Sequence, residues 1–431
     1  MRKVLSAIIV STFIFLMNCS HLHHTTYCTE PTKTTLHKTL DNFPGIKIKV
    51  LEPDSIYIEK YEIMLTQPLN HKNPESEQFQ QCIFLSHKGY DAPTVLHTEG
   101  YSAGRNFCAE LPELINANEI RVEHRFFGKS LPDSMNWQFL NLEQETADYH
   151  RIIELFKTIY PGKWINTGWS KGGQTSIFHR YFYPNDVVAS VIYDSPINFE
   201  LEDCRIDEYF EKVGSPECRQ GLIDFQRLAL FRKDELLPLF KWYTKGKGYK
   251  YSIGLEKAFE YVVLEYPFSF WQYKEIDCNT IPTSTYSTDE IFEHLLDVVS
   301  FSSYADKSMN SASMFQFSTQ LGYYGYVTKN VVDLLSCDDY PNSAFAPQVP
   351  ELKYDPEPMQ KINEWLQEEG NNFIYIYGAN DPWSAPAVNI SDKVNSKKYY
   401  LNRGNHFTFI KTFPEEKQEE ILNTIREWIV E

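Results

Sequence analysis

The stretch over residues 166–173, Asn-Thr-Gly-Trp-Ser-Lys-Gly-Gly, constrains this chain more than any other. It places Ser170 at the centre of a Gly-x-Ser-x-Gly pattern with one further glycine. A short strand-like run, residues 163–166, precedes it, and residues 174–183, which end before Pro184, are typical of a helix of two or three turns. The glycines allow backbone and helix to approach more closely than a Cβ would permit. The pattern predicts a strand, a sharp turn with serine at its apex, and a helix.

This arrangement is a nucleophile elbow, and it predicts an α/β-hydrolase fold. The helix N-terminus beneath the serine offers free N–H groups that stabilise an oxyanion, with the amide of Lys171 as the first donor. A second donor is expected from the loop after the strand over residues 93–98, where Gly100 and Tyr101 lie. The sequence leaves open whether a backbone N–H or the Tyr101 hydroxyl serves.

The spacing of apolar residues divides the chain into a hydrolase core and an insertion. Strand and helix patterns alternate around the elbow, which predicts a mostly parallel sheet with helices on both faces. From residue 198 to 347 this alternation stops, and the sequence becomes aromatic-rich with helical spacing. We therefore expect a core over 46–197, an inserted helical cap over 198–347, and the second part of the core over 348–431.

A hydrolase serine needs a histidine base, and the base needs an orienting carboxylate. In this fold both follow late strands, in the order Ser, Asp, His. Asp381 follows the apolar run 372–377, and His406 follows the short run 398–401. These residues are the predicted partners of the serine. The alternative candidates lie in the expected cap: Asp338, Asp339 and His294.

The N-terminus has the features of a targeting segment. A basic start leads into an apolar stretch, residues 4–17, that is too short for a stable membrane span, and then into Cys19. The Leu-Met-Asn-Cys ending is similar to a bacterial lipobox, although Asn18 departs from the small residue usual there. We expect a signal peptide and lipobox over 1–19, lipidation of Cys19, and a flexible tether over 20–45. The protein is then exported, either anchored by its lipid in the periplasm or at the cell surface, or secreted.

The charge and the cysteines limit the possible partners. A formal net charge of −17 argues against nucleic acid or an anionic membrane as a partner. If Cys19 carries lipid, seven of the eight cysteines remain, so at least one does not pair within the chain. Cys204 with Cys218 is the expected disulfide, and Cys278 with Cys337 is a second option. No cysteine spacing fits zinc, and neither a metal nor another cofactor is expected.

Several motifs together resemble known serine peptidases. The Glu-His-Arg-Phe-Phe-Gly-Lys-Ser segment within residues 123–132 resembles the lysosomal prolyl carboxypeptidase and dipeptidyl peptidase group. A closer likeness is to serine peptidase family thirty-seven, carried by residues 168–174, 193–196 and 266–272. The resemblance covers most of the chain after residue 46. It implies an α/β-hydrolase with a helical cap that removes short peptides from the N-terminus of its substrates, often after proline.

The resemblance maps the triad onto Ser170, Asp381 and His406. An aminopeptidase must also hold a free ammonium group, which calls for a carboxylate in the cap. Residues 251–300 carry nine acids against two bases, and Glu265, beside an aromatic run, is the expected anchor. Trp271 is a candidate to stack on a proline ring, with core packing as its alternative.

Three other functions remain open at this point. A prolyl carboxypeptidase or dipeptidyl peptidase-like enzyme and an esterase or lipase would use the same fold. A surface binding protein that keeps an inactive hydrolase fold is the alternative outside enzymes. The leading hypothesis is a serine exopeptidase that acts on peptides through an acyl-enzyme.

Overall fold

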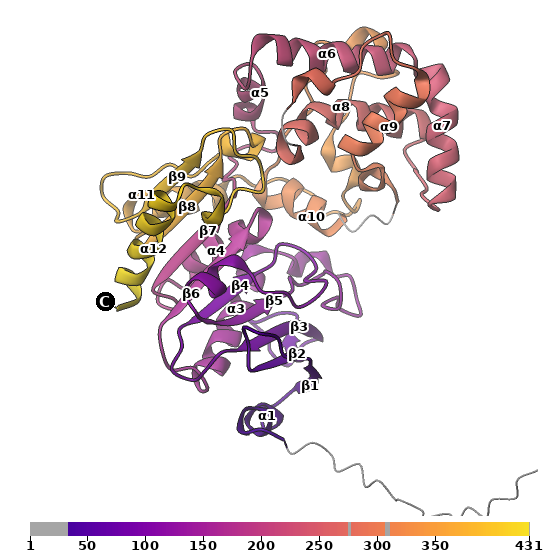
Figure 1. The fold of residues 1–431 in the computed structure, drawn as a ribbon. Helices are drawn as coiled ribbons and strands as arrows, with labels where there is room; N and C mark the ends of the chain where they lie inside the picture. The colour runs from indigo at the N-terminus through magenta and orange to yellow at the C-terminus, as the bar shows by residue number, and fades with distance from the viewer. Residues whose placement is uncertain (1–32, 275–276, 307–310, 431) are drawn as a thin grey trace, which may run out of the picture. The chain divides into compact units, whose positions relative to one another are not determined.

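The computed structural model describes residues 33–274, 277–306 and 311–430 (Figure 1). The chain divides into a small N-terminal unit, Met1–Phe43, and a large unit, Pro44–Glu431. The predicted signal peptide and lipobox, Cys19 included, lie outside the described residues. In the small unit, α1 (Thr35–Asp41) occupies part of the predicted flexible tether. The Thr34 hydroxyl caps this helix by accepting a hydrogen bond from the His37 N–H at 3.1 Å, so a polar segment still forms a helical turn here.

Among the described residues, one nine-stranded sheet organises the large unit (Figure 1). The strand order is β1-β2-β3-β5-β4-β6-β7-β8-β9. Pairing is antiparallel from β1 to β3 and between β3 and β5, and parallel from β5 through to β9. The strands are β1 (Ile46–Leu51), β2 (Glu59–Pro68), β3 (Gln78–His87), β4 (Thr94–Thr98), β5 (Asn118–Val122), β6 (Trp164–Trp169), β7 (Ala189–Tyr193), β8 (Phe373–Gly378) and β9 (Lys397–Leu401).

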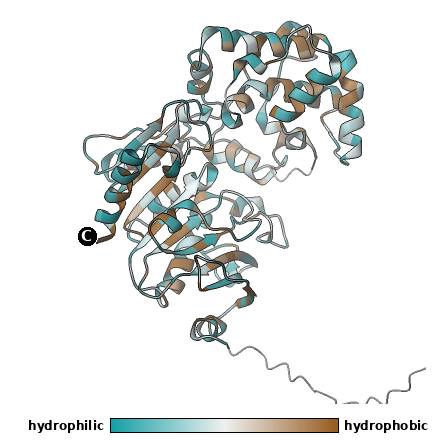
Figure 2. Cartoon of the chain, viewed as in Figure 1, coloured by the Kyte–Doolittle hydropathy of each residue, from teal (hydrophilic) through white to brown (hydrophobic). Residues whose placement is uncertain are grey.

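Helices cover both faces of this sheet because successive residues of a strand point to opposite sides. Val191 of β7 packs in a cluster with α2 and α12, whereas its neighbour Ile192 packs with α3, α4 and α11. These helices are α2 (Glu110–Leu114), α3 (Leu142–Lys157), α4 (Lys171–Phe182), α11 (Glu357–Glu368) and α12 (Glu415–Val430). Figure 2 shows apolar residues in the central strands and polar residues on the flanking helices. The doubly covered, mostly parallel sheet confirms the predicted α/β-hydrolase fold.

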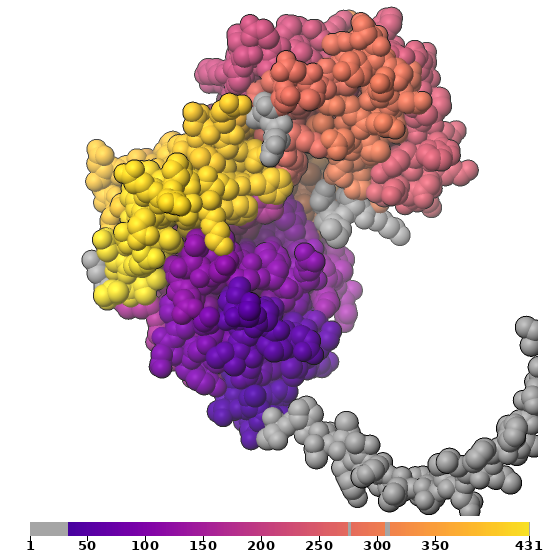
Figure 3. All heavy atoms as spheres, viewed as in Figure 1, coloured from indigo at the N-terminus to yellow at the C-terminus, as the bar shows by residue number. Residues whose placement is uncertain are grey.

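Between β7 and α11 the described residues form helices and connecting loops, which make a lobe of their own in Figure 3. Its long central helix, α8, contacts α6, α7 and α9 and contributes more buried residues to the apolar core of this cap than any other described helix. The elements are α5 (Cys204–Phe210), α6 (Pro216–Phe231), α7 (Lys233–Gly246), α8 (Leu255–Tyr273), η2 (Cys278–Thr280), α9 (Thr288–Val298), η3 (Phe301–Tyr304), α10 (Ser311–Gln316), η4 (Phe317–Leu321), η5 (Val332–Leu334) and η6 (Asn342–Phe345).

The disulfide of the cap differs from both expected pairs. Cys218 of α6 is bonded to Cys278 of η2, with a Cα–Cα distance of 5.3 Å. Cys204 is exposed and free, and Cys337 is also free. The predicted Cys204–Cys218 pair was therefore wrong, because Cys218 is buried in the cap core whereas Cys204 begins α5 at the surface. Proximity in sequence did not indicate which thiols the helices bring together.

No helix within the described ranges combines the length and the apolar character that crossing a membrane requires.

Candidate active site

The serine turn joins β6 to α4. Ser170 has φ 57° and ψ −130°, a conformation that is strained for a residue with a Cβ. A Cβ added to Gly168 would lie 2.2 Å from the Gly172 carbonyl oxygen, so strand and helix meet where only glycine fits. The strand, turn and helix predicted from residues 166–173 are present, and the turn presents Ser170 at the end of the sheet.

The predicted acid and base meet at the ends of the last two strands of the sheet, β8 and β9. Asp381 follows β8, His406 follows β9, and Asp381 Oδ2 lies 2.6 Å from His406 Nδ1. The side chains are 0% and 1% exposed, respectively. Burial raises the pKa of Asp381, and the hydrogen-bonded imidazole opposes this rise. The arrangement can hold the imidazole in the tautomer that leaves Nε2 free to accept a proton.

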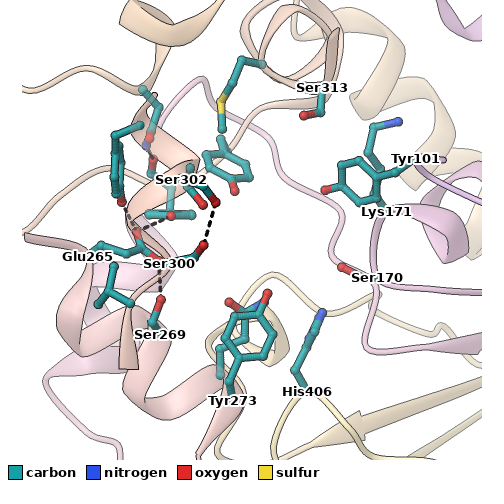
Figure 4. A pocket seen from close by; sticks show the side chains of 18 of the residues that line it. Tyr101, Ser170, Lys171, Glu265, Ser269, Tyr273, Ser300, Ser302, Ser313 and His406 are labelled. Atoms are coloured by element: carbon teal, nitrogen blue, oxygen red, sulfur yellow. Dashed lines mark hydrogen bonds between the residues drawn. The ribbon is translucent and has the colours of Figure 1, made fainter. Parts of the chain in front are cut away.

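Two contacts hold the His406 loop beside the serine. The indole Nε1 of Trp169 donates to the His406 carbonyl oxygen at 2.6 Å, and the His406 N–H donates to the Gln272 carbonyl oxygen at 3.0 Å. The first contact comes from the residue before Ser170 and the second from cap helix α8. Ser170 and His406 line the same cavity, and the ring nitrogen of His406 points toward Ser170 (Figure 4).

The predicted oxyanion residues lie on the same side of this cavity. Gly100, Tyr101 and Lys171 line it beside Ser170. A Cβ on Gly100 would lie 2.6 Å from the Gly172 nitrogen, so the loop after β4 packs directly against the first turn of α4. The Tyr101 ring packs edge-on against Phe127, with ring centroids 5.6 Å apart. The loop and the helix N-terminus thus meet as an oxyanion site requires.

The cavity has a volume of about 840 Å³ and extends from Ser170 into the cap. Ser170 and His406 lie on one side of it, and Glu265 and Ser269 of α8 lie on the other (Figure 4). It is large enough for several substrate residues, since ligand pockets of a few hundred Å³ enclose drug-sized molecules.

Glu265 is the buried carboxylate of the cap side. It is 8% exposed and accepts hydrogen bonds from the Tyr324 hydroxyl at 2.6 Å, the Ser269 hydroxyl at 2.9 Å and the Tyr304 hydroxyl at 3.2 Å. Burial raises the pKa of Glu265 to about 7, although the three donors oppose the shift. Among the described side chains, no cation pairs with Glu265. The sequence had indicated Glu265 but not its tyrosine donors, which come from distant segments.

Trp271 is placed differently from the prediction that it binds substrate. Its side chain is 1% exposed in the cap core, and a Cβ on Gly214 would lie 2.3 Å from the indole. It packs edge-on against Phe270. Glu265 and Trp271 lie on different faces of α8. Trp271 points to the cap core, whereas Glu265 points to the cavity. The core-packing alternative is the correct one for Trp271.

The Glu-His-Arg segment supports the oxyanion loop from behind. The His124 N–H donates to the Tyr101 carbonyl oxygen at 3.1 Å, and His124 Nε2 lies 2.8 Å from Glu145 Oε2. Glu145 also accepts from the Gln316 side chain at 2.6 Å. These buried hydrogen bonds tie the loop to α3 and to the cap helix α10, which restricts its movement. The other candidate base, His294, bonds instead with the Tyr266 hydroxyl at 2.7 Å in the cap.

A strained serine elbow on a sheet of this topology defines a serine hydrolase of the α/β-hydrolase class. Comparisons with known proteins place the chain more narrowly. The chain belongs to the PS-10 peptidase S37 family, whose profile matches residues 29–428. It is a serine peptidase, and the predicted resemblance to serine peptidase family thirty-seven is confirmed.

The chain is also similar to individual proteins. The prolyl tri/tetrapeptidyl aminopeptidase of Streptomyces mobaraensis is 32% identical over 400 residues, covering 89% of this chain and 83% of that protein. The lysosomal Pro-X carboxypeptidase of Homo sapiens is 31% identical over 126 residues, covering 27% and 25%, respectively. Among solved structures, the proline iminopeptidase of Mycobacterium smegmatis has a TM-score of 0.44 at 13% identity, covering 85% of this chain and 99% of that chain.

Proposed function

We propose that this protein is an exported serine exopeptidase that removes short peptides from the N-terminus of its substrates. The observation that carries the proposal is a single cavity with Ser170 and His406 on one side and the buried carboxylate of Glu265 on the other. Such a cavity can hold a substrate amine at a fixed distance from the reacting serine. The similarity to a prolyl tri/tetrapeptidyl aminopeptidase supports the same activity.

Ser170, His406 and Asp381 perform the chemistry in this proposal. Ser170 Oγ attacks the scissile carbonyl carbon while His406 Nε2 takes its proton, and Asp381 stabilises the imidazolium. The N–H of Lys171 and a donor from the Gly100–Tyr101 loop stabilise the oxyanion. His406 then returns the proton to the leaving amine, and an acyl-enzyme remains. Water activated by His406 releases the acyl peptide and regenerates Ser170.

Glu265 sets which end of the peptide is recognised. A carboxylate in a poorly solvated site attracts an ammonium group and repels a substrate carboxylate. Burial raises the pKa of Glu265 to about 7. A bound ammonium group would favour the ionised form and lower this pKa again. Glu265 is therefore fully ionised when an ammonium group is bound beside it. This favours binding of an N-terminal amine over a C-terminal carboxylate.

A preference for proline at the cleavage site is part of the same proposal. Aromatic side chains line the cavity between the serine and the cap, Phe317, Tyr323 and Trp383 among them. Flat aromatic faces suit the rigid pyrrolidine ring. The prolyl specificity in the name of the Streptomyces mobaraensis relative supports this assignment.

The test is one proline-containing peptide in free, N-acetylated and C-amidated forms, with the products identified by mass. We expect acetylation to lower kcat/KM sharply and amidation to have little effect. Equal cleavage of the free and acetylated forms, or stepwise loss from the C-terminus, would favour a carboxypeptidase-like activity. Fast ester turnover without peptide cleavage would favour an esterase. Ser170→Ala should lower activity by on the order of a million-fold, and retention of most activity would remove the triad assignment.

Export and lipid attachment at Cys19 complete the proposal. The apolar N-terminal segment supports export, and so does the Cys218–Cys278 disulfide, since disulfides persist in oxidising compartments. The test is fractionation of cells that express the full chain after labelling with a radioactive fatty acid. Cys19→Ser should abolish the label and release the protein from the membrane fraction, and label that persists would argue against lipidation.

A further inference from the structure

A second buried carboxyl group lies beside the Asp381–His406 pair. Asp194 directly follows β7, as Asp381 follows the neighbouring parallel strand β8 after a short loop. One ligand atom from each of Asp194, Asp381 and His406 lies within 4.8 Å of the other two. Asp194 is 0% exposed. The two strand ends therefore bring two acids, rather than one, to the same imidazole.

The two oxygens of Asp194 have different surroundings. Oδ1 accepts a hydrogen bond from the Gly378 N–H at 2.8 Å. Oδ2 is buried and accepts no hydrogen bond of ordinary length and angle from a described residue, although the Thr408 backbone lies close enough to favour the carboxylate. The backbone of Asp194 adopts a left-handed conformation, with φ 45°. A buried polar atom without a partner costs free energy, so its presence beside a catalytic pair calls for a functional explanation.

Electrostatics determines how the two acids share charge. Carboxylates this close cannot readily both be ionised. Burial and the charge of Asp381 raise the pKa of Asp194 well above its ordinary value, while the backbone of Gly378 and Thr408 opposes the rise. Besides Asp381, the titratable groups close to Asp194 include His406 and Tyr377, whose hydroxyl donates to the Ser195 carbonyl oxygen at 2.7 Å. The pair thus carries one charge, which resides on Asp381 because that residue bonds His406 directly.

We propose that Asp194 is a second acid for His406, a positioning residue that stays neutral while Asp381 is ionised and takes over its charge when Asp381 cannot carry it. The inference rests on the triad of the proposed function. In either arrangement one carboxylate lies within a short side-chain movement of the imidazole. The imidazolium that forms during proton transfer therefore always has a counter-charge.

The test is a double-mutant cycle on kcat/KM between pH 5 and 10 with the peptide substrate. The variants are Asp194→Asn, Asp381→Asn and the double variant. In a triad with one acid, replacing it by Asn lowers the rate by about ten-thousandfold. In this protein we expect Asp381→Asn alone to lower kcat/KM by only about a hundredfold, because Asp194 compensates. Asp194→Asn should lower kcat/KM by less than about tenfold when Asp381 is present. When it is added to Asp381→Asn, it should lower kcat/KM by about a further hundredfold.

The pH profile of Asp381→Asn gives an independent readout. Its activity should require ionised Asp194, so the rise of kcat/KM with pH should shift to higher pH than in the wild-type enzyme. This measurement needs no change at position 194. Asn tolerates a left-handed backbone and has nearly the shape of Asp, so the fold should be retained, as thermal unfolding would check.

Two results would overturn the proposal. One is that Asp194→Asn lowers kcat/KM by the same factor with and without Asp381→Asn, which would show that the two carboxyl groups act independently. The other is an Asp381→Asn pH profile with the wild-type shape. Ser170→Ala distinguishes a failure of the Asp194 proposal from a failure of the proposed function. If Ser170→Ala stays active, the triad assignment itself is wrong, whatever the result for Asp194.

Discussion

The Nζ atom of Lys171 donates a hydrogen bond to the carbonyl oxygen of Gly100 at 2.9 Å. Lys171 is the residue after Ser170, and Gly100 lies in the loop that follows β4, so this bond joins the two halves of the predicted oxyanion site. The Lys171 side chain is buried, and its Nζ lies 5.5 Å from the ring centroids of both Tyr101 and Phe127. The Lys171 side chain thus holds the loop beside the first turn of α4, and Lys171 also lines the cavity.

Replacing the Lys171 side chain should therefore impair catalysis more than substrate binding. Without the bond to Gly100, the loop donor is free to shift relative to the oxyanion. We expect Lys171→Met to lower kcat by about tenfold to a hundredfold with little change in KM, since misplaced groups act chiefly on the transition state. Steady-state kinetics tests this, with Lys241→Met on the exposed side of α7 as the control. A change confined to KM would contradict it.

The same lysine predicts a pH dependence of stability. Burial lowers the pKa of Lys171 to about 8, below the value it has in the unfolded chain. Between about pH 8 and pH 10.5 the unfolded state therefore binds more protons than the folded state, and stability rises with pH across that window. Denaturant unfolding should show wild type gaining up to roughly 3 kcal/mol relative to Lys171→Met from pH 8 to 10.5. A constant difference between the two proteins would show that the lysine is not desolvated.

The elbow glycine should tolerate no side chain. The alanine methyl in Gly168→Ala would lie 2.2 Å from the Gly172 carbonyl oxygen, so β6 and α4 would have to separate. We expect loss of about 2 kcal/mol or more of stability and a large loss of kcat, because Ser170 moves with the turn. Gly246→Ala is the matched control, since no atom lies within 4 Å of the position its methyl would take and it ends a helix. Thermal unfolding and steady-state kinetics of both variants test this, and equal stability and kcat in the two variants would contradict it.

The core of the site was predictable because its signals are local. Ser170 is marked by its glycines, and Asp381 and His406 by their positions just after apolar strands. A parallel sheet brings such strand ends to one edge, so the order along the chain was enough to assign them. Asp194 also follows an apolar strand, yet one sequence pattern could not show that two acids reach the same histidine.

The cap was predictable only as a helical region. The donors of Glu265 come from α8 itself, in Ser269, and from distant segments, in Tyr304 and Tyr324. The i+4 spacing of Ser269 was readable, but the tyrosines are brought in by tertiary packing. The disulfide and the burial of Trp271 depend in the same way on how helices pack, which periodicity alone does not determine.

The Cys218–Cys278 disulfide should stabilise the cap. It closes a loop with a sequence separation of 60 residues, for which loop entropy suggests about 4 kcal/mol. We expect Cys218→Ser to lower the Tm of the cap and to make the protein insensitive to reductant. Cys204→Ser, which alters a free and exposed thiol, is the control and should leave the Tm unchanged. Calorimetry with and without reductant measures both, and an unchanged Tm in Cys218→Ser would contradict the expectation.

The last prediction concerns Glu265 and the substrate amine. The ratio of kcat/KM for free and N-acetylated peptide isolates amine recognition, because the catalytic residues act on both substrates alike. This ratio should rise with pH through about 7 as Glu265 ionises, and fall above about 8 as the substrate amine loses its proton. Glu265→Gln should lower kcat/KM for the free peptide by about a hundredfold and flatten the ratio near one. Glu293→Gln, on the exposed face of α9, is the control and should keep the wild-type profile. A pH-dependent ratio that survives in Glu265→Gln would mean that another group holds the amine.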